Sequence, residues 1–199
     1  MRTRKTTVIL ISGKAESGKS TTAELLESKL KGKEGLDVVR YSFANPIKYI
    51  AQAFGGWNKE KDPKGRRFLQ SIGKSFREYD INIWVKHFLN QMDKHKGPIP
   101  VNFYLIDDWR FPDEYSYLKS NPLLDVLAVR ITGRGGLSGD EAADSSENSL
   151  PEPIDEYYGN GKGDAYGYDF VIENSGDIEL LSSKIDIVLS VLEKQYIVE

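Results

Sequence analysis

The chain has 199 residues, of which 39% are hydrophobic and 29% are charged, and its formal net charge is −3 at pH 7. This apolar content predicts one ordinary folded domain and excludes a disordered chain. The chain has no cysteine, no long basic block and no apolar run near the roughly 20 residues of a membrane helix. We therefore expect no thiolate metal site, no binding to a nucleic acid polymer, no membrane association and a cytoplasmic location.

Strand and helix patterns alternate along the chain. The basic start runs into an apolar segment, residues 6–11, which is too short for a signal peptide and is typical of a buried parallel strand. Further strands are predicted at 36–43, 101–106, 123–131 and 168–174, and helices at 22–30, 46–54, 65–78, 82–95, from 112 onward and at 178–192. Asn45 is expected to cap the second helix, with Pro46 at its first position. This alternation predicts an α/β sandwich built on a parallel sheet of five strands flanked by helices.

The segment between the first strand and the first helix, SGKAESGKST (12–21), has the spacing of a phosphate-binding P-loop. Its glycines let the backbone N–H groups turn toward phosphate oxygens, and the following helix adds the positive end of its dipole. Lys19 can reach the β- and γ-phosphates, and Ser20 can place its hydroxyl on Mg²⁺. A plain glycine turn is the alternative, but the strand before and the helix after favour the P-loop. The predicted ATP contacts here are Gly13, Ala15, Glu16, Ser17, Gly18, Lys19, Ser20 and Thr21.

Two aspartates, Asp107 and Asp108, follow the predicted strand 101–106. P-loop enzymes place an acid at the end of a neighbouring strand to hold Mg²⁺ or its water shell. Ligands of parallel sheets bind outside the carboxyl ends of the strands, where both acids would lie. Capping of the next helix is the alternative function of either acid.

Arginine is better supplied near these loops than histidine, of which the chain has two. Phosphoryl transfer needs spread positive charge more than a proton acceptor, because an acceptor phosphate is already largely ionised near neutral pH. We therefore favour phosphate as the acceptor, with Arg110 and Arg134 as first candidates, although each could be a surface residue. Arg130, near the end of its strand, could equally be structural. The other candidates are Arg66, Arg67 and Arg77.

Residues 132–167 are rich in Gly, Ser and acids and almost lack aliphatic side chains. A loop this long inside a compact domain is either functional or disordered. We interpret it as a lid that closes over bound nucleotides and excludes water, with a disordered insert as the alternative.

Several segments resemble the phage-type deoxynucleoside monophosphate kinases, a branch of the P-loop nucleoside monophosphate kinases. The resemblance covers nearly the whole chain, and D-x-R-F-P-x-E after a strand is its most distinctive part. The matching segments are GKAESGKST, FANPIK (43–48), RRFLQSIGKSFRE (66–78), DINIWV (80–85), DWRFPDE (108–114), VRITGR (129–134), SSE (145–147) and YDFVIENSG (168–176).

The resemblance implies a single P-loop kinase domain over 1–199, with a helical substrate-binding region at 43–95. ATP with Mg²⁺ would phosphorylate a deoxynucleoside monophosphate to the diphosphate, and the source would be a phage, with the host cytoplasm as location. Lys19, Asp108, Arg110 and Arg134 would be catalytic, Ser20 and Asp108 would hold the metal, and Arg130 and Asn174 would join the ATP site. The implied substrate contacts are Phe43, Lys48, Arg66, Arg67, Gln70, Trp84, Asp108, Arg110 and Glu147.

The sequence departs from the family pattern at one position and leaves several alternatives open. The family often has a histidine two residues before the Ser-Glu of the lid, where this chain has Asp144. An aromatic such as Trp84 or Phe111 is more often part of the core than a base-stacking side chain. The alternatives to a deoxynucleotide kinase are a kinase of another small phosphorylated metabolite, of the dephospho-coenzyme A or phosphomevalonate type, and a non-catalytic nucleotide-binding module. The accepted base, and whether the chain forms a homodimer, are open.

Overall fold

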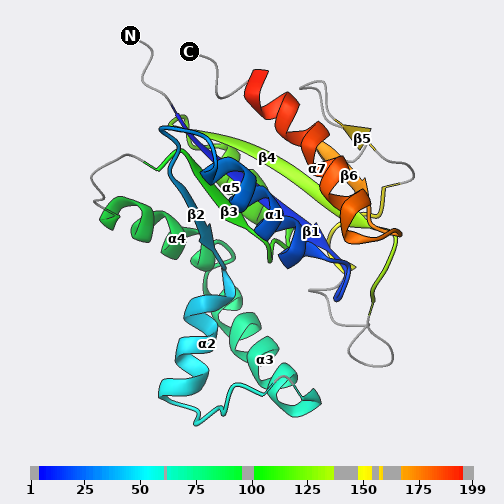
Figure 1. The fold of residues 1–199 in the computed structure, drawn as a ribbon. Coiled ribbons are helices and arrows are strands. Elements are labelled where there is room, and N and C mark those ends of the chain that lie inside the picture. Colours follow the sequence, from blue (N-terminus) through cyan, green and yellow to red (C-terminus); the bar gives the residue numbers. More distant parts are fainter. Residues whose placement is uncertain are drawn as a thin grey trace.

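The computed structural model describes residues 5–60, 62–95, 101–136, 148–153, 157–158 and 167–194. Strands and helices alternate along most of this range, as the sequence predicts (Figure 1). The strands are β1 (Thr6–Gly13), β2 (Val38–Tyr41), β3 (Phe103–Ile106), β4 (Leu124–Thr132), β5 (Tyr157–Tyr158) and β6 (Phe170–Glu173). The helices are α1 (Lys19–Lys31), α2 (Ala44–Ala53), α3 (Pro63–Tyr79), α4 (Ile83–Lys94), α5 (Pro112–Lys119) and α7 (Ile178–Leu192).

The strands form one sheet in the order β2-β3-β1-β4-β6-β5. The pairings among β2, β3, β1, β4 and β6 are all parallel, so the predicted parallel sheet of five strands is confirmed. The two-residue β5, from within the predicted lid segment, adds an antiparallel strand at the β6 edge. The central β1 lies between β3 and β4, which puts the loop after β1 in the middle of the sheet's carboxyl edge.

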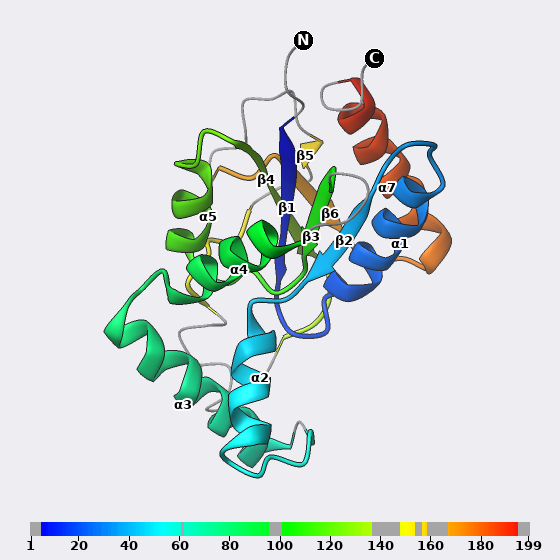
Figure 2. The ribbon, with the colours of Figure 1, turned by 90° about the vertical axis from the view of Figure 1, so that its left-hand side faces the viewer.

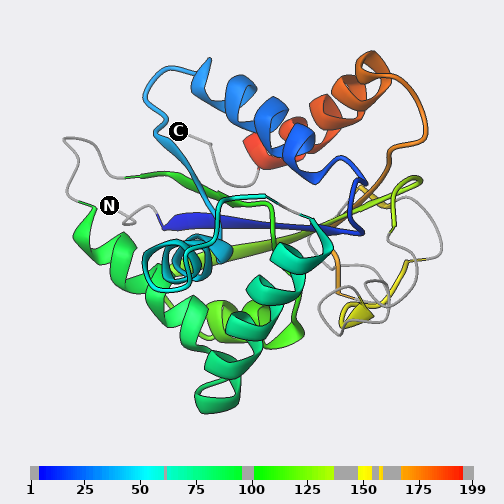
Figure 3. The same ribbon diagram turned by 90° about the horizontal axis from the view of Figure 1, so that it is seen from below.

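Two hydrophobic clusters cover the two faces of the sheet, because successive side chains of a strand point to opposite faces. Ile9 and Ile11 pack with the apolar sides of α1 and α7 on one face. Val8 and Leu10 pack on the other face with α4, α5 and the buried Phe43. Figure 3 shows these layers, with α1 and α7 on one side of the sheet and α4 and α5 on the other.

Helices α2 and α3 form an arm that projects from the carboxyl end of β2 (Figures 1 and 2). Each of the two helices has a single buried residue, Ala51 in α2 and Gly65 in α3. The arm is therefore attached to the body mainly at its two ends, after β2 and before α4. We refer to α2 and α3 as the helical arm.

The start of the arm corrects one prediction. Asn45 does not cap α2, which begins one residue earlier at Ala44. The backbone N–H groups of Phe43 and Ala44 donate instead to the carboxylate of Asp108, at 2.9 and 2.8 Å. A distant acid fulfils the capping role because it lies where the helix dipole is positive and the N–H groups need acceptors. Across the described ranges, no helix combines the length and the apolar character that crossing a bilayer requires.

Candidate active site

The predicted site residues gather at one edge of the sheet because the parallel strands end there together. Leu10 of β1 lies beside Ile106 of β3, Gly13 lies beside Ile131 of β4, and Thr132 lies beside Glu173 of β6. The residues that follow these strands are therefore neighbours: the loop 13–20, Asp107 and Asp108, the segment 133–136 and Asn174. This carboxyl edge is where parallel α/β sheets bind ligands.

The loop between β1 and α1 has the tight, glycine-dependent backbone that the P-loop motif predicts. Gly13 has a φ of 153° and Gly18 a φ of 98°, values that favour glycine. A Cβ atom on Gly13 would lie 2.6 Å from the carbonyl oxygen of Ile131, and one on Gly18 would lie 2.3 Å from the side-chain nitrogen of Asn174. Both glycines of the motif are thus required by their conformation and by their close contacts.

Lys19, the first residue of α1, turns its side chain back over this loop. Its ammonium group donates to the carbonyl oxygen of Gly13 at 2.7 Å and also to that of Lys14. These two hydrogen bonds hold the charge above the loop. This arrangement places a positive charge beside the backbone N–H groups of the cradle, as binding of a nucleotide phosphate requires.

Asn174, predicted to join the ATP site, is buried behind the loop and is only 6% exposed. Its side-chain nitrogen donates to the carbonyl oxygen of Ser17 at 2.8 Å. Its own backbone N–H donates to Thr132 at 2.9 Å. The side chain of Asn174 therefore fastens the P-loop to the ends of β4 and β6.

The first residues of the predicted lid pack directly on the P-loop. The backbone N–H of Gly136 donates to the carbonyl oxygen of Ala15 at 2.7 Å. A Cβ atom on Gly135 would lie 2.2 Å from that same oxygen, so the two backbones approach closely. Arg134 is exposed, and its guanidinium donates to the carbonyl oxygens of Asn174, at 2.5 Å, and Gly176. A catalytic role for Arg134 would require it to leave these carbonyls.

Asp107 and Asp108 differ in their partners. Asp107 pairs with Arg40 of β2 at 3.0 Å. Asp108 accepts three hydrogen bonds at the start of the arm, from the hydroxyl of Ser42 at 2.7 Å and from the two N–H groups described above. Burial raises the pKa of Asp108, and the three hydrogen bonds oppose that rise. Asp108 is therefore the acid that joins the carboxyl edge of the sheet to the arm.

The side-chain oxygens at this edge of the sheet could supply only part of the coordination shell of Mg²⁺. Ser20 is exposed at the first turn of α1 and offers a hard hydroxyl oxygen. A carboxylate has about four acceptor positions, and Asp108 already uses three of them. No cluster of three or more His, Cys, Asp or Glu side chains suited to a metal occurs in the part of the chain that the structure describes. These residues fit an ion bound mainly by phosphate and water oxygens, as Mg²⁺ usually is beside a nucleotide.

Arg110 lies in the short segment between β3 and α5, and Glu114 holds its backbone. One oxygen of Glu114 accepts from the N–H groups of Arg110 and Phe111, both at 3.0 Å. The indole N–H of the buried Trp109 donates to the carbonyl oxygen of Phe111 at 2.8 Å. Sequence reasoning missed Glu114, the third residue of α5. A glutamate at that position can reach back to the backbone N–H of the residue before the helix, which is the signal that could have found it.

Arg130 is buried on β4 and pairs with Glu152. Glu152 also lies 3.8 Å from the ammonium group of Lys14 in the P-loop. It was not predicted, because its contacts come from residues far away in the sequence. In this structure Arg130 contacts a carboxylate near the P-loop, so its predicted ATP contact remains a prediction.

The predicted substrate residues divide into two groups. Phe43 and Trp84 are buried, at 3% and 5% exposure, and Trp84 packs on Phe76 with ring centroids 5.2 Å apart. The structure gives both aromatics packing roles, and for Trp84 this is what the core alternative expects. Glu147 lies outside the described residues, as does Asp144. Apart from Asp108 and Arg110, described above, the remaining predicted residues are on the helical arm: Lys48 in α2, and Arg66, Arg67 and Gln70 in α3.

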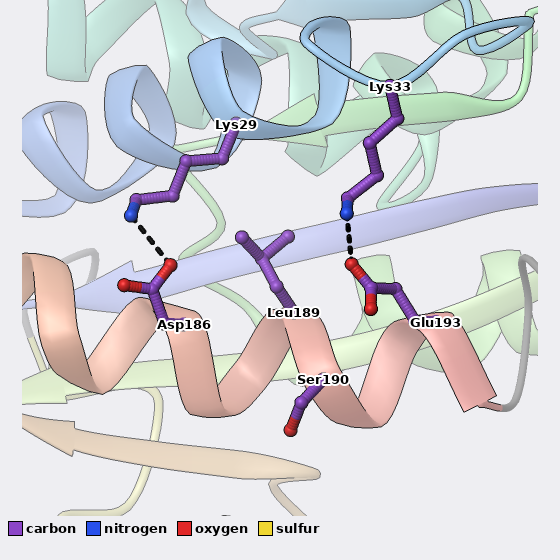
Figure 4. Close-up of a pocket in the computed structure, with 6 residues that line it drawn as sticks. All are labelled: Lys29, Lys33, Asp186, Leu189, Ser190 and Glu193. Atoms are coloured by element: carbon purple, nitrogen blue, oxygen red, sulfur yellow. Dashed lines mark hydrogen bonds and ion pairs between the residues drawn. The ribbon is translucent and has the colours of Figure 1, made fainter.

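A depression of about 290 Å³ lies away from this edge, between α1 and α7. Figure 4 shows Lys29 opposite Asp186 and Lys33 opposite Glu193. The ammonium group of Lys29 lies 2.6 Å from the carboxylate of Asp186. The charges lining it thus neutralise one another across the two helices. We assign this depression to helix packing and not to ligand binding.

Comparisons with known proteins add little to this geometry. No protein-family model matches the chain. An uncharacterized protein, ORF77 of Ictalurid herpesvirus 1 (strain Auburn), is 29% identical over 129 residues, which is 65% of this chain and 53% of that protein. The chain thus spans about half the length of this curated relative.

Two solved structures cover almost the whole chain at low similarity. The Mycobacterium tuberculosis APS kinase CysC in complex with AMPPNP and APS has a TM-score of 0.46 and 10% identity, covering 94% of this chain and 99% of that one. A gluconokinase from Sinorhizobium meliloti 1021 has a TM-score of 0.49 and 12% identity, covering 98% of each chain. Because these likenesses are weak, the fold described above rests on the strand order and register.

Proposed function

We propose that this chain is a kinase that transfers the γ-phosphoryl group of ATP to the phosphate of a deoxynucleoside monophosphate. The observation that carries the proposal is the preset ammonium group of Lys19, held over the P-loop by two carbonyl oxygens. Asp108 and Arg110 follow the neighbouring β3 at the same edge of the sheet. The sequence resemblance supplies the acceptor class.

The triphosphate of ATP would bind the P-loop N–H groups and Lys19. Mg²⁺, when bound through the hydroxyl of Ser20 and water held by Asp108, would neutralise phosphate charge. An oxygen of the acceptor phosphate attacks the γ-phosphorus, and the bond to the β,γ-bridging oxygen breaks. ADP leaves with that bond's electron pair, and the products are ADP and a deoxynucleoside diphosphate. No protein base is needed, since the acceptor phosphate is already largely ionised near neutral pH.

Positive side chains support this step on the acceptor side. Arg110 would counter the charge on the phosphoryl group in transfer, an interaction worth most where water is excluded. The acceptor would bind on the helical arm, opposite the P-loop. The contacts proposed there are Lys48, Arg66, Arg67 and Gln70.

Residues 132–167 would close over both nucleotides, so that ATP is not hydrolysed by water. Their first residues already contact the P-loop through Gly136 and Ala15. Adenine would then lie near Arg134 and the loop after β6, where Asn174 and Gly176 present carbonyl oxygens.

A panel of phosphorylated acceptors tests this proposal. ADP formation is measured with each deoxynucleoside monophosphate, with the matching ribonucleotides, and with dephospho-coenzyme A and phosphomevalonate. Lys19→Met and Asp108→Asn serve as inactive controls. Turnover with at least one deoxynucleotide is expected. ADP formation only with another metabolite would show that the proposed acceptor class is wrong. ATP binding without turnover on any acceptor would show that the chain is not a kinase.

A further inference from the structure

Two charged residues that the proposed mechanism does not use, Glu114 and Arg77, hold the segment of Arg110, one at its backbone and the other at the ring of Phe111. We propose that they form an interlock through which the helical arm sets the position of Arg110. Both are then positioning residues, because neither needs to touch a substrate. The function of the interlock in catalysis rests on the proposed kinase activity, whereas its mechanical action can be measured without any substrate.

Glu114 connects the two halves of the interlock through its two carboxylate oxygens. It is only 3% exposed. Its Oε2 atom accepts from the backbone N–H groups of Arg110 and Phe111, both at 3.0 Å. Its Oε1 atom lies 3.7 Å from the guanidinium of Arg77. One oxygen therefore fixes the segment of Arg110, and the other faces the arm.

Arg77 comes from the last turn of α3, at the end of the arm. Its side chain is 14% exposed. The guanidinium carbon lies 3.7 Å from the ring centroid of Phe111, a stacked cation–π contact. The guanidinium also donates to the carbonyl oxygen of Ile81 at 3.2 Å. Arg77 is thus held both by the chain that leads from α3 to α4 and by the ring next to Arg110.

The segment between these contacts is stiff enough to transmit a displacement. The backbone carbonyl oxygen of Phe111 accepts from the indole N–H of Trp109, and its backbone N–H donates to Glu114. Its ring is covered by Arg77. A shift of the end of α3 would therefore move the ring of Phe111 and the neighbouring backbone of Arg110 together. An arm that closes on an acceptor would bring Arg110 into place by this route.

The charge of Glu114 controls the strength of the interlock. The charged groups that act on it are Arg77 from α3 and Asp108, which follows β3. Its neighbour Asp113 lies 3.7 Å from the same guanidinium of Arg77. Burial, with a smaller contribution from Asp108, raises the pKa of Glu114 to about 7 against its hydrogen bonds and Arg77. Protonation removes the attraction to Arg77, while a neutral carboxyl group can still accept from the two N–H groups. The interlock is therefore engaged at alkaline pH and weakened in mild acid.

Amide hydrogen exchange in the ligand-free protein at pH 8 tests the interlock directly. The amides of Arg110 and Phe111 are followed in the wild type and in Arg77→Met, which removes the charge and the stacking but keeps the aliphatic stem. We expect exchange about fivefold faster in this variant, the size of one lost cation–π contact. Asp113→Asn is the matched control, since Asp113 also lies 3.7 Å from Arg77 but is 50% exposed. Equal exchange in Arg77→Met and the control would overturn the proposal.

Two further measurements separate positioning from a general loss of structure. Glu114→Gln keeps an acceptor for the two N–H groups but removes the charge, so its effect and that of Arg77→Met should not add in the double variant. Additive effects on exchange would contradict the interlock. In the kinase assay, the two variants should lower kcat with the acceptor while the Kd of ATP stays at the wild-type value. An equal loss of ATP affinity would contradict positioning. If no acceptor supports turnover, the proposed function is wrong. The amide-exchange measurements then decide by themselves whether the interlock exists.

Discussion

The contact between Asn174 and the P-loop gives the sharpest prediction from this structure. The side chain of Asn174 donates to the carbonyl oxygen of Ser17 at 2.8 Å, and both residues are buried. Asn174→Ala removes the donor and leaves the carbonyl oxygen without it. Asn174→Asp places a carboxylate oxygen where the donor was and adds repulsion. Both variants should loosen the loop that is proposed to bind the phosphates.

The size of the effect follows from the burial of the contact. An unsatisfied buried carbonyl costs about 1–3 kcal/mol, so the free energy of unfolding of Asn174→Ala should fall by about this amount. The same energy is needed to reorder the loop around a ligand, and each 1.4 kcal/mol is a factor of about ten in affinity. We therefore expect ATP to bind roughly five- to 150-fold more weakly.

Urea unfolding and equilibrium binding of ATP measure the two effects, and Ser175→Ala is the control because Ser175 is the exposed neighbour. Binding of inorganic tripolyphosphate separates the two possible roles of Asn174. Fastening of the loop predicts weaker binding of both ligands, whereas a contact with adenine predicts weaker binding of ATP alone. Unchanged stability and unchanged tripolyphosphate affinity in Asn174→Ala would refute the reasoning.

Three further predictions follow from single positions. Lys19→Met should weaken ATP binding about 100-fold, through loss of charge-assisted hydrogen bonds of about 1.5–3 kcal/mol each, and wild-type affinity by calorimetry would contradict the P-loop assignment. Gly135→Ala should weaken ATP binding, because its Cβ would lie 2.2 Å from the oxygen of Ala15. Gly167→Ala is the control, since Gly167 has the same φ of 87° but nothing within 4 Å of its Cβ position. Equal losses of ATP affinity in the two variants would show that backbone strain, and not the contact with Ala15, is responsible. Because the pKa of Glu114 rises from 4.5 to about 7 on folding, the folded protein binds this proton more tightly, and the resulting stabilisation is complete below pH 4.5 and lost as pH rises through about 7. The free energy of unfolding of the wild type relative to Glu114→Gln should therefore fall by about 3 kcal/mol between these limits, and a difference independent of pH in urea titrations would contradict the burial argument.

Prediction from sequence succeeded where the signal is local. The apolar run of β1, the periodic α1 and the glycine spacing between them are separated by few residues, so each local preference points to the same structure. Even so, the cap of α2 was predicted wrongly. Asn45 and Pro46 satisfy the local rule, but Asp108, more than 60 residues away, supplies the acceptors. The carboxylate of Asp108, which the sheet places at the start of α2, therefore accepts the hydrogen bonds that the local rule assigns to Asn45.

For the same reason, the sequence indicated the surroundings of some predicted site residues and not of others. Residue type and spacing identified Gly13, Gly18 and Lys19, whose conformation and contacts are local to one loop. They could not assign Asn174 to the back of that loop, because its partner Ser17 is 157 residues away. Nor could they pair Glu114 with Arg77, since that contact depends on how the arm packs against α5.

The sequence by itself determined the order of strands and helices and the residues available for phosphate binding, because hydrophobic period and glycine spacing act over one or two turns of chain. The tertiary structure decided which of those residues meet. Parallel pairing brings the ends of β1, β3, β4 and β6 to one edge, where buried polar groups must find partners whatever their distance along the chain. Asn174 under the P-loop, Asp108 at the start of the arm and Glu114 behind Arg110 are the outcomes of that requirement.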